Sequence, residues 1–126
     1  MGLGDYFEKA KGLGVLATAS ASGEIDAAVY GRPHFIDEQT VAFIMADHLS
    51  HENLKTNAHA TYLFIEQGGG YQGKRLYLSK IKEETDPQKI QAMRRRPLPA
   101  ECESEGEPRY LVYFMVDRVR PLIGDE

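Results

Sequence analysis

Short apolar runs separated by turn residues recur along most of the chain. Six runs are rich in Val, Ile, Leu, Ala, Thr, Tyr and Phe, and most are bounded by Gly, Pro, Asn, Asp or Ser. This pattern is typical of β-strands. Ser22-Gly23 predicts a tight hairpin turn, and Gly31 and Pro33 predict a bend within the second strand. The expected strands are 15–20, 24–36, 40–46, 60–66, 74–82 and 109–120.

Three segments have the start signals and periodicity of helices. Asp5 is a candidate N-cap for a short helix over 4–11, and Ser50 for a helix that ends near Asn57. Asp86-Pro87 is a strong helix start, with an end expected near Arg96 before Pro97. Residues 97–107 are expected to form an exposed loop.

The order of these elements indicates a mainly β fold with short helices. Because the strands are linked mostly by turns, the pattern favours a six-stranded antiparallel sheet or barrel over a parallel α/β fold. Both faces of the strands 40–46 and 109–120 are apolar, so both faces are expected to be buried. A barrel has one interior, so helices or a partner subunit must cover the outer face, and a symmetric dimer is the commonest assembly.

Composition narrows the class of protein. The 126 residues, with 42% hydrophobic content, fit one domain over 1–126. The net charge of −4 argues against nucleic-acid binding. The single cysteine, Cys102, fits a reducing compartment. No apolar run is long enough to span a membrane and no signal peptide is evident, so we expect a cytoplasmic protein without membrane contact.

A polar cluster, Asp47 to Asn53, lies where the third expected strand runs into the second helix. A helix start presents free backbone N–H groups and a positive dipole end, which suit a phosphate. The cluster contains no lysine or arginine that would complete such a site.

Three segments in order resemble the FMN-binding split-barrel family of pyridoxamine 5′-phosphate oxidase and the small FMN-binding proteins. The resemblance covers roughly residues 10 to 82 and is moderately specific through order and spacing. The segments are Gly14-Val-Leu-Ala-Thr-Ala-Ser-Ala-Ser-Gly23, Ile25-Asp-Ala-Ala-Val-Tyr-Gly-Arg32 and Asn53-Leu-Lys-Thr-Asn-Ala-His-Ala-Thr61.

The resemblance implies a six-stranded split β-barrel that forms a homodimer, with FMN at the subunit interface. A deazaflavin-type cofactor or haem are the alternatives. The resemblance also implies three groups of cofactor-binding residues. The isoalloxazine or ribityl chain would lie along Tyr30, Gly31 and Arg32, the strand end near the flavin would be Ala46 and Asp47, and the phosphate would lie among His48, Ser50, His51 and Asn53.

The sequence departs from the family at one important place. Where the family usually carries lysine or arginine before the Asn-Leu pair, this chain has Leu49-Ser50-His51-Glu52. Arg32, a protonated His51, or Lys74 and Arg75 beyond the glycine loop could supply the missing charge.

Other candidate chemistry is weaker. The spacing of His48 and His51 could suit a metal, but the sequence completes no ligand set, so no metal site is expected. Cys102 has no histidine base near it in the sequence and is not expected to be a nucleophile.

Two functions fit these observations. The first is a flavin-dependent oxidoreductase or electron carrier acting on a small molecule, in which the flavin does the redox chemistry and no catalytic residue is assigned. The second is a non-catalytic binding module that keeps the barrel and binds another ligand or none. The missing basic residue favours the second.

Overall fold

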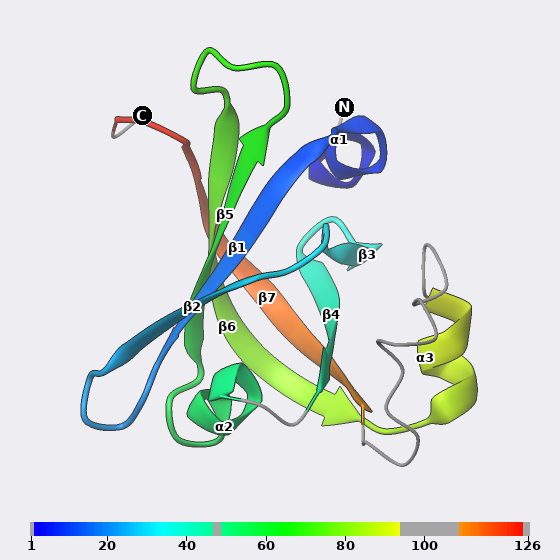
Figure 1. Ribbon diagram of the computed structural model, residues 1–126. Helices are drawn as coiled ribbons and strands as arrows, with labels where there is room; N and C mark the ends of the chain where they lie inside the picture. Colours follow the sequence, from blue (N-terminus) through cyan, green and yellow to red (C-terminus); the bar gives the residue numbers. More distant parts are fainter. Residues whose placement is uncertain (1, 47–48, 94–108, 125–126) are drawn as a thin grey trace, which may run out of the picture.

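A computed structural model describes residues 2–46, 49–93 and 109–124. The elements follow one another as strands and short helices along the chain (Figure 1). They are α1 (Leu3–Lys9), β1 (Gly12–Ala19), β2 (Ile25–Val29), β3 (His34–Asp37), β4 (Thr40–Ala46), α2 (Leu49–Thr56), β5 (His59–Glu66), β6 (Gly73–Glu84), α3 (Pro87–Met93) and β7 (Arg109–Pro121).

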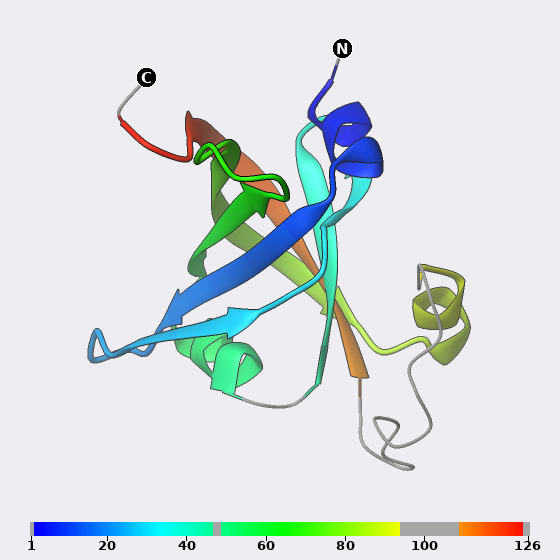
Figure 2. The same ribbon diagram turned by 45° about the horizontal axis from the view of Figure 1, so that its top comes forward.

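The strands form one antiparallel sheet that curls into a barrel. Its order is β2-β1-β5-β6-β7-β4-β3, so β2 and β3 lie at opposite edges although they are consecutive in the chain. Residues 30–33 connect the two edges and bridge the open side of the barrel. Figures 1 and 2 show α1 and α2 at opposite ends of this barrel. The expected mainly β, antiparallel barrel is therefore confirmed.

The strand count differs from the expectation in one place. The expected strand 24–36 is two strands, β2 and β3, so the sheet formed by the described residues has seven strands rather than six. Gly31 and Pro33 fall between them, because the chain must leave one edge and join the other there. The Ser22-Gly23 turn is confirmed: Ser20 N–H donates to Glu24 O at 2.8 Å, and Gly23 has a φ of 90°.

Alternate residues of each strand fill the interior. In β1, Leu16 and Thr18 point inward and are buried, while Ala17 between them is partly exposed. Phe7 of α1 and Leu54 of α2 close the two ends of the interior. The remaining buried members of this core are Val41, Phe43, Met45, Ala60, Tyr62, Phe64, Leu76, Leu78, Val112 and Phe114.

A second, smaller apolar cluster lies outside the barrel. Ile90 of α3 packs there against Ala42, Leu111 and Tyr113 of β4 and β7. A helix therefore covers part of the outer face, as the two apolar faces of these strands predicted. The prediction is wrong for Met115, which is 46% exposed because it lies farther along β7 than the α3 cluster.

The helix starts agree with the sequence at one of three positions. Asp86 is the N-cap of α3, and its Oδ1 accepts the Gln88 N–H at 3.0 Å. The other two predicted caps are wrong, because α1 begins at Leu3 and α2 at Leu49, which place Asp5 and Ser50 inside the first turn. Among the helices in the described residues, none has the length and apolar content needed to cross a membrane.

Candidate functional site

The start of α2 faces β2 and forms a partly buried polar corner. Ser50 is 3% exposed, and its Oγ–H donates to Asp26 Oδ2 of β2 at 3.4 Å. Ser50 also hydrogen-bonds the Tyr30 hydroxyl. Burial raises the pKa of Tyr30, the bond from Ser50 partly opposes this, and the nearby Asp26 charge adds to the rise. Tyr30 therefore stays a neutral phenol that can donate a hydrogen bond to an anion.

Asn53 continues the corner one turn farther along α2. It is 5% exposed, and its Nδ2 donates to Thr18 Oγ1 of β1 at 3.0 Å. Thr18 is itself 2% exposed. This buried bond joins the helix to the strand, so it fixes where the corner lies relative to the barrel.

The barrel interior fixes the chain at residues 30 and 31. Tyr62 Oη–H donates to Gly31 O at 2.9 Å, and Tyr30 N–H donates to Gly14 O at 3.0 Å. A Cβ on Gly14 would lie 1.9 Å from Tyr62 Oη and 2.6 Å from Tyr30 O. Glycine at position 14 therefore permits the close approach that holds Tyr30 in place.

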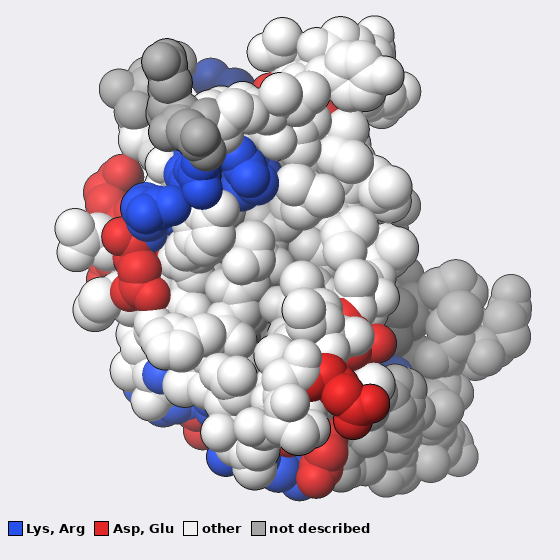
Figure 3. Space-filling model, turned by 90° about the vertical axis from the view of Figure 1, so that its left-hand side faces the viewer, with Lys and Arg blue, Asp and Glu red and all other residues white. Residues whose placement is uncertain are grey.

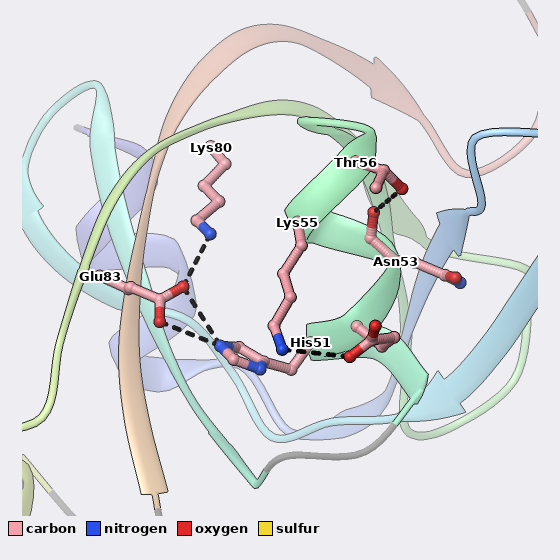
Figure 4. A network of polar contacts seen from close by, with 7 residues as sticks. His51, Asn53, Lys55, Thr56, Lys80 and Glu83 are labelled. Carbon is pink, nitrogen blue, oxygen red and sulfur yellow. Dashed lines mark hydrogen bonds and ion pairs between the residues drawn. The ribbon is translucent and has the colours of Figure 1, made fainter.

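His51 points away from this corner and into a separate network (Figure 4). It is 1% exposed, stacks on Tyr110 with centroids 4.0 Å apart, and its Nε2 lies 3.1 Å from Glu83 Oε2. Lys80 Nζ lies 2.7 Å from the other oxygen of Glu83. Burial tends to raise the pKa of Glu83, but the bonds from Lys80 and His51 outweigh it and lower this pKa.

The other predicted cations also lie elsewhere. Arg32 Nη1 donates to the carbonyl oxygens of Phe7, Glu8 and Ala10, at 2.9, 3.1 and 2.8 Å, and so binds the C-terminal end of α1. Lys74 Nζ lies 4.7 Å from the centroid of the Tyr6 ring. Arg75 Nε donates to Pro121 O at 2.8 Å.

The structure therefore brings together part of the predicted set. Tyr30, Ser50 and Asn53 lie around the start of α2, and Gly31 follows Tyr30 on the same fixed segment. Arg32 and His51 bind other groups. Ala46 is half-buried at the end of β4, opposite Arg109. Asp47 and His48 lie outside the described residues, as do Cys102 and the expected loop 97–107.

Sequence reasoning missed three residues that shape this region. Asp26 and Thr18 follow the alternation of their strands, and Glu83 lies near the end of β6. Inward alternation from Leu16 could have placed Thr18 inside the barrel. No sequence signal joins Glu83 to His51, because the two are brought together only by packing.

A groove of about 820 Å³ lies at the α1 end, away from this corner. Its walls include Tyr6 and Lys9 of α1, Glu66 at the end of β5, and Lys74 of β6. Tyr6 donates a hydrogen bond to Glu66 across it. None of the predicted cofactor-binding residues that the structure describes lines this groove.

The corner has hydrogen-bond donors that suit a phosphate, but its described residues lack the positive side chain that would balance the phosphate's charge. Ser50, Asn53 and Tyr30 supply two hydroxyls and an amide, and α2 begins at Leu49. Among the described residues, these three side chains hydrogen-bond to Asp26, Thr18 and one another rather than to a lysine or arginine, and Asp26 adds a carboxylate. The donor set therefore fits a phosphate group, with its countercharge still to be supplied.

The sequence matches no family model and no curated protein. Solved structures do match along nearly the whole chain. An FMN-binding protein from Syntrophomonas wolfei subsp. wolfei superposes with a TM-score of 0.76 at 13% identity, over 98% of this chain and 85% of that one. The chain has the fold of the FMN-binding split-barrel family.

Two further split barrels are similar at comparable length. An F420 reductase matches with a TM-score of 0.71 at 15% identity, over 92% of this chain and 94% of that one. HupZ from Group A Streptococcus matches with a TM-score of 0.71 at 18% identity, over 98% of this chain and 93% of that one. At these identities the likeness establishes the split-barrel fold.

Proposed function

We propose that this split barrel binds a flavin-type cofactor, FMN, and acts as a flavin-dependent oxidoreductase or electron carrier on a small molecule. The observation that carries the proposal is the group of buried donors at the start of α2. Ser50 and Asn53 are almost fully buried although both are polar, and both lie at a helix start that suits a phosphate. Structures with the same fold include an FMN-binding protein and an F420 reductase.

The chain's own residues would bind and orient the cofactor. Ser50 Oγ–H, turned from Asp26 toward the ligand, and the second N–H of the Asn53 amide would bind the phosphate, and Tyr30 and Gly31 would lie along the ribityl chain or ring. When bound, FMN would supply the redox chemistry. The bonds from Tyr62 and to Gly14 hold residues 30 and 31 still, which lowers the entropic cost of binding.

The proposed assembly is a homodimer through the outer face of β1 and β2. Ile25 is 77% exposed, Val29 69% and Leu13 51%, so the face presents apolar side chains to solvent. Figure 3 shows that the side of the molecule that faces left in Figure 1 has a broad area without Lys, Arg, Asp or Glu, bordered by charged side chains. A second copy of the chain on this face would bury these side chains and place the flavin site at the interface.

A second candidate is the non-catalytic binding module. Asp26 beside Ser50 favours it, because a carboxylate disfavours a phosphate dianion. Under this alternative the barrel would bind a ligand without a phosphate.

A titration of the purified protein with FMN separates the flavin-binding proposal from the binding-module alternative. Quenching of flavin fluorescence measures the binding. We expect saturable binding that Ser50→Ala weakens about tenfold. Ser22→Ala, at the exposed hairpin turn, is the matched control and should leave binding unchanged. Affinity for riboflavin equal to that for FMN would favour the binding module.

The dimer has its own test. Val29→Glu should convert the protein from dimer to monomer in sedimentation velocity at micromolar concentration. Tyr71→Glu is the control, since Tyr71 is 77% exposed at the tip of the β5–β6 hairpin. If the wild-type protein is a monomer, the proposed homodimer is wrong. The cofactor proposal is then still tested by the FMN titration.

A further inference from the structure

Two charged residues occupy inward-facing positions of the strands at the α1 end of the barrel. In β6, Lys74 precedes the buried Leu76 by two residues, so both lie on the inward face. In β5, Glu66 follows the buried Phe64 by two residues in the same way. Charged residues at core positions are unfavourable unless they have a function there. Both side chains line the groove of about 820 Å³, so they face an opening of the barrel rather than its packed interior.

Tyr6 of α1 keeps these two charges apart. Its hydroxyl donates a hydrogen bond to Glu66, while Lys74 Nζ lies 4.7 Å from the centroid of its ring. Burial raises the pKa of Tyr6, and the bond to Glu66 and the negative charge of Glu66 raise it further, so the phenol stays protonated and keeps this donor. Among the described residues, Lys74 forms no ion pair. Its ammonium group therefore faces the groove without a carboxylate partner.

Two further lysines line the same groove. Lys9 is the last residue of α1, and Lys11 follows the helix. In the part of the chain that the structure describes, neither forms an ion pair. The Lys11 carbonyl accepts the Gln67 N–H at 2.7 Å, which fixes this segment to the end of β5. The charged side chains in the walls are thus three lysines against the carboxylates of Asp5 and Glu66, an excess of one positive charge.

The groove also has apolar walls and the size of a small-molecule site. Leu3 and Ala10 line it, and both pack against the barrel core. Ligand sites in proteins typically have volumes of about 300–1,000 Å³. Figures 1 and 2 show α1 and the β5–β6 hairpin at the same end of the barrel. The side chains of the proposed dimer face, Leu13, Ile25 and Val29, are not among its walls, so the groove is a separate surface.

We propose that this groove binds an organic monocarboxylate, with the carboxylate at Lys74 and the apolar part against Leu3 and Ala10. An ammonium group forms a charge-assisted hydrogen bond with a carboxylate. The excess of one positive charge matches a monoanion better than a phosphate dianion. Lys9 and Lys11 add to the positive potential that attracts the anion. The site lies at the end of the barrel opposite α2 and does not depend on the proposed function.

Naphthoate is a suitable probe, because it joins one carboxylate to a flat apolar group. We expect saturable binding by isothermal titration calorimetry, weakened about tenfold by Lys74→Met. Methionine keeps most of the apolar stem of the lysine and removes its charge. Lys55→Met is the matched control, since it removes an exposed cation of α2 at the opposite end of the barrel and should leave binding unchanged. The uncharged amide of naphthoate should bind the wild-type protein about tenfold more weakly.

Glu66→Gln gives a result that a damaged fold would not produce. Glutamine can still accept the bond from the Tyr6 hydroxyl, and the change removes a negative charge beside the bound carboxylate. Naphthoate should therefore bind about threefold more tightly. Tyr6→Phe should weaken binding instead, because the released Glu66 carboxylate can then pair with Lys74.

Three results would overturn the proposal. They are the absence of saturable naphthoate binding, binding that Lys74→Met leaves unchanged, and equal binding of naphthoate and its amide. Tighter binding of naphthyl phosphate than of naphthoate would overturn the choice of a monoanion. Ser50→Ala, which should weaken FMN binding, should leave naphthoate binding unchanged, so failure of this site can be distinguished from failure of the flavin site.

Discussion

The Tyr62 hydroxyl lies 2.9 Å from the carbonyl oxygen of Gly31 and 3.4 Å from that of Tyr30. Tyr62 is a core residue of β5, whereas residues 30 and 31 lie at the open side of the barrel. This one side chain therefore connects the packed interior to the segment proposed to contact the flavin.

Tyr62→Phe should show what this connection contributes. We expect the free energy of unfolding to fall by about 1 kcal/mol, since the Gly31 carbonyl loses its donor in this part-buried hydrogen bond while the ring still fills its place. FMN affinity should fall with it, because residues 30 and 31 become less ordered. Urea unfolding and the fluorescence titration measure the two effects. Tyr71→Phe is the matched control at an exposed position, and equal behaviour of the two variants would contradict the assignment.

Gly14→Ala should be more damaging than the loss of the hydroxyl. Its Cβ would lie 1.9 Å from Tyr62 Oη and 2.6 Å from a backbone oxygen, so the strand or the Tyr30 segment must shift. Overpacking of this kind costs about 1–3 kcal/mol. Gly31→Ala is the control, since a Cβ there meets nothing within 4 Å. Thermal unfolding of the two variants checks the difference, and a neutral Gly14→Ala would be inconsistent with the packing described.

Stability should depend on the ionisation of Glu83. Lys80 and His51 lower the pKa of Glu83 in the folded protein despite its burial. The ionised carboxylate therefore stabilises the fold above the unfolded pKa of roughly 4.3, and this stabilisation is lost as the pH falls through the lower folded pKa. Glu83→Gln should remove this part of the acid dependence. Urea midpoints between about pH 6 and pH 3 test it, with Glu52→Gln, an exposed carboxylate on α2, as the control. Parallel pH profiles for wild type and Glu83→Gln would refute the assignment.

Arg32→Ala separates a structural role from cofactor binding. Three carbonyl oxygens at the end of α1 lose a charged donor, so we expect a loss of about 1–3 kcal/mol in unfolding free energy. FMN affinity of the folded variant should stay unchanged. A fall in affinity with stability preserved would instead support the sequence-based prediction that Arg32 contacts the cofactor.

The sequence predicted the fold well because its signals are local. Alternation, the Ser22-Gly23 turn and the Asp86-Pro87 helix start each depend on neighbouring residues, and the structure bears them out. The second strand was predicted as one piece because a bend at Gly31 and Pro33 does not reveal whether the chain stays in the same edge of the sheet.

The candidate site was harder to predict because its contacts join distant segments. Ser50 and Asn53 were predicted to lie close together because both follow the junction between a strand and a helix, and in the structure both lie on α2. Arg32 and His51 looked equivalent to them in sequence, but packing turns one toward α1 and the other toward Glu83. The contacts of Tyr6 with Glu66 and Lys74 depend on how α1 packs on the barrel, which a single sequence does not contain.

The most direct test of the flavin-binding proposal is the visible spectrum of the protein after incubation with FMN and removal of free flavin. We predict a retained absorption band near ~450 nm, with about one FMN per chain, that Ser50→Ala diminishes and Ser22→Ala preserves. A colourless protein that retains no FMN would contradict the account.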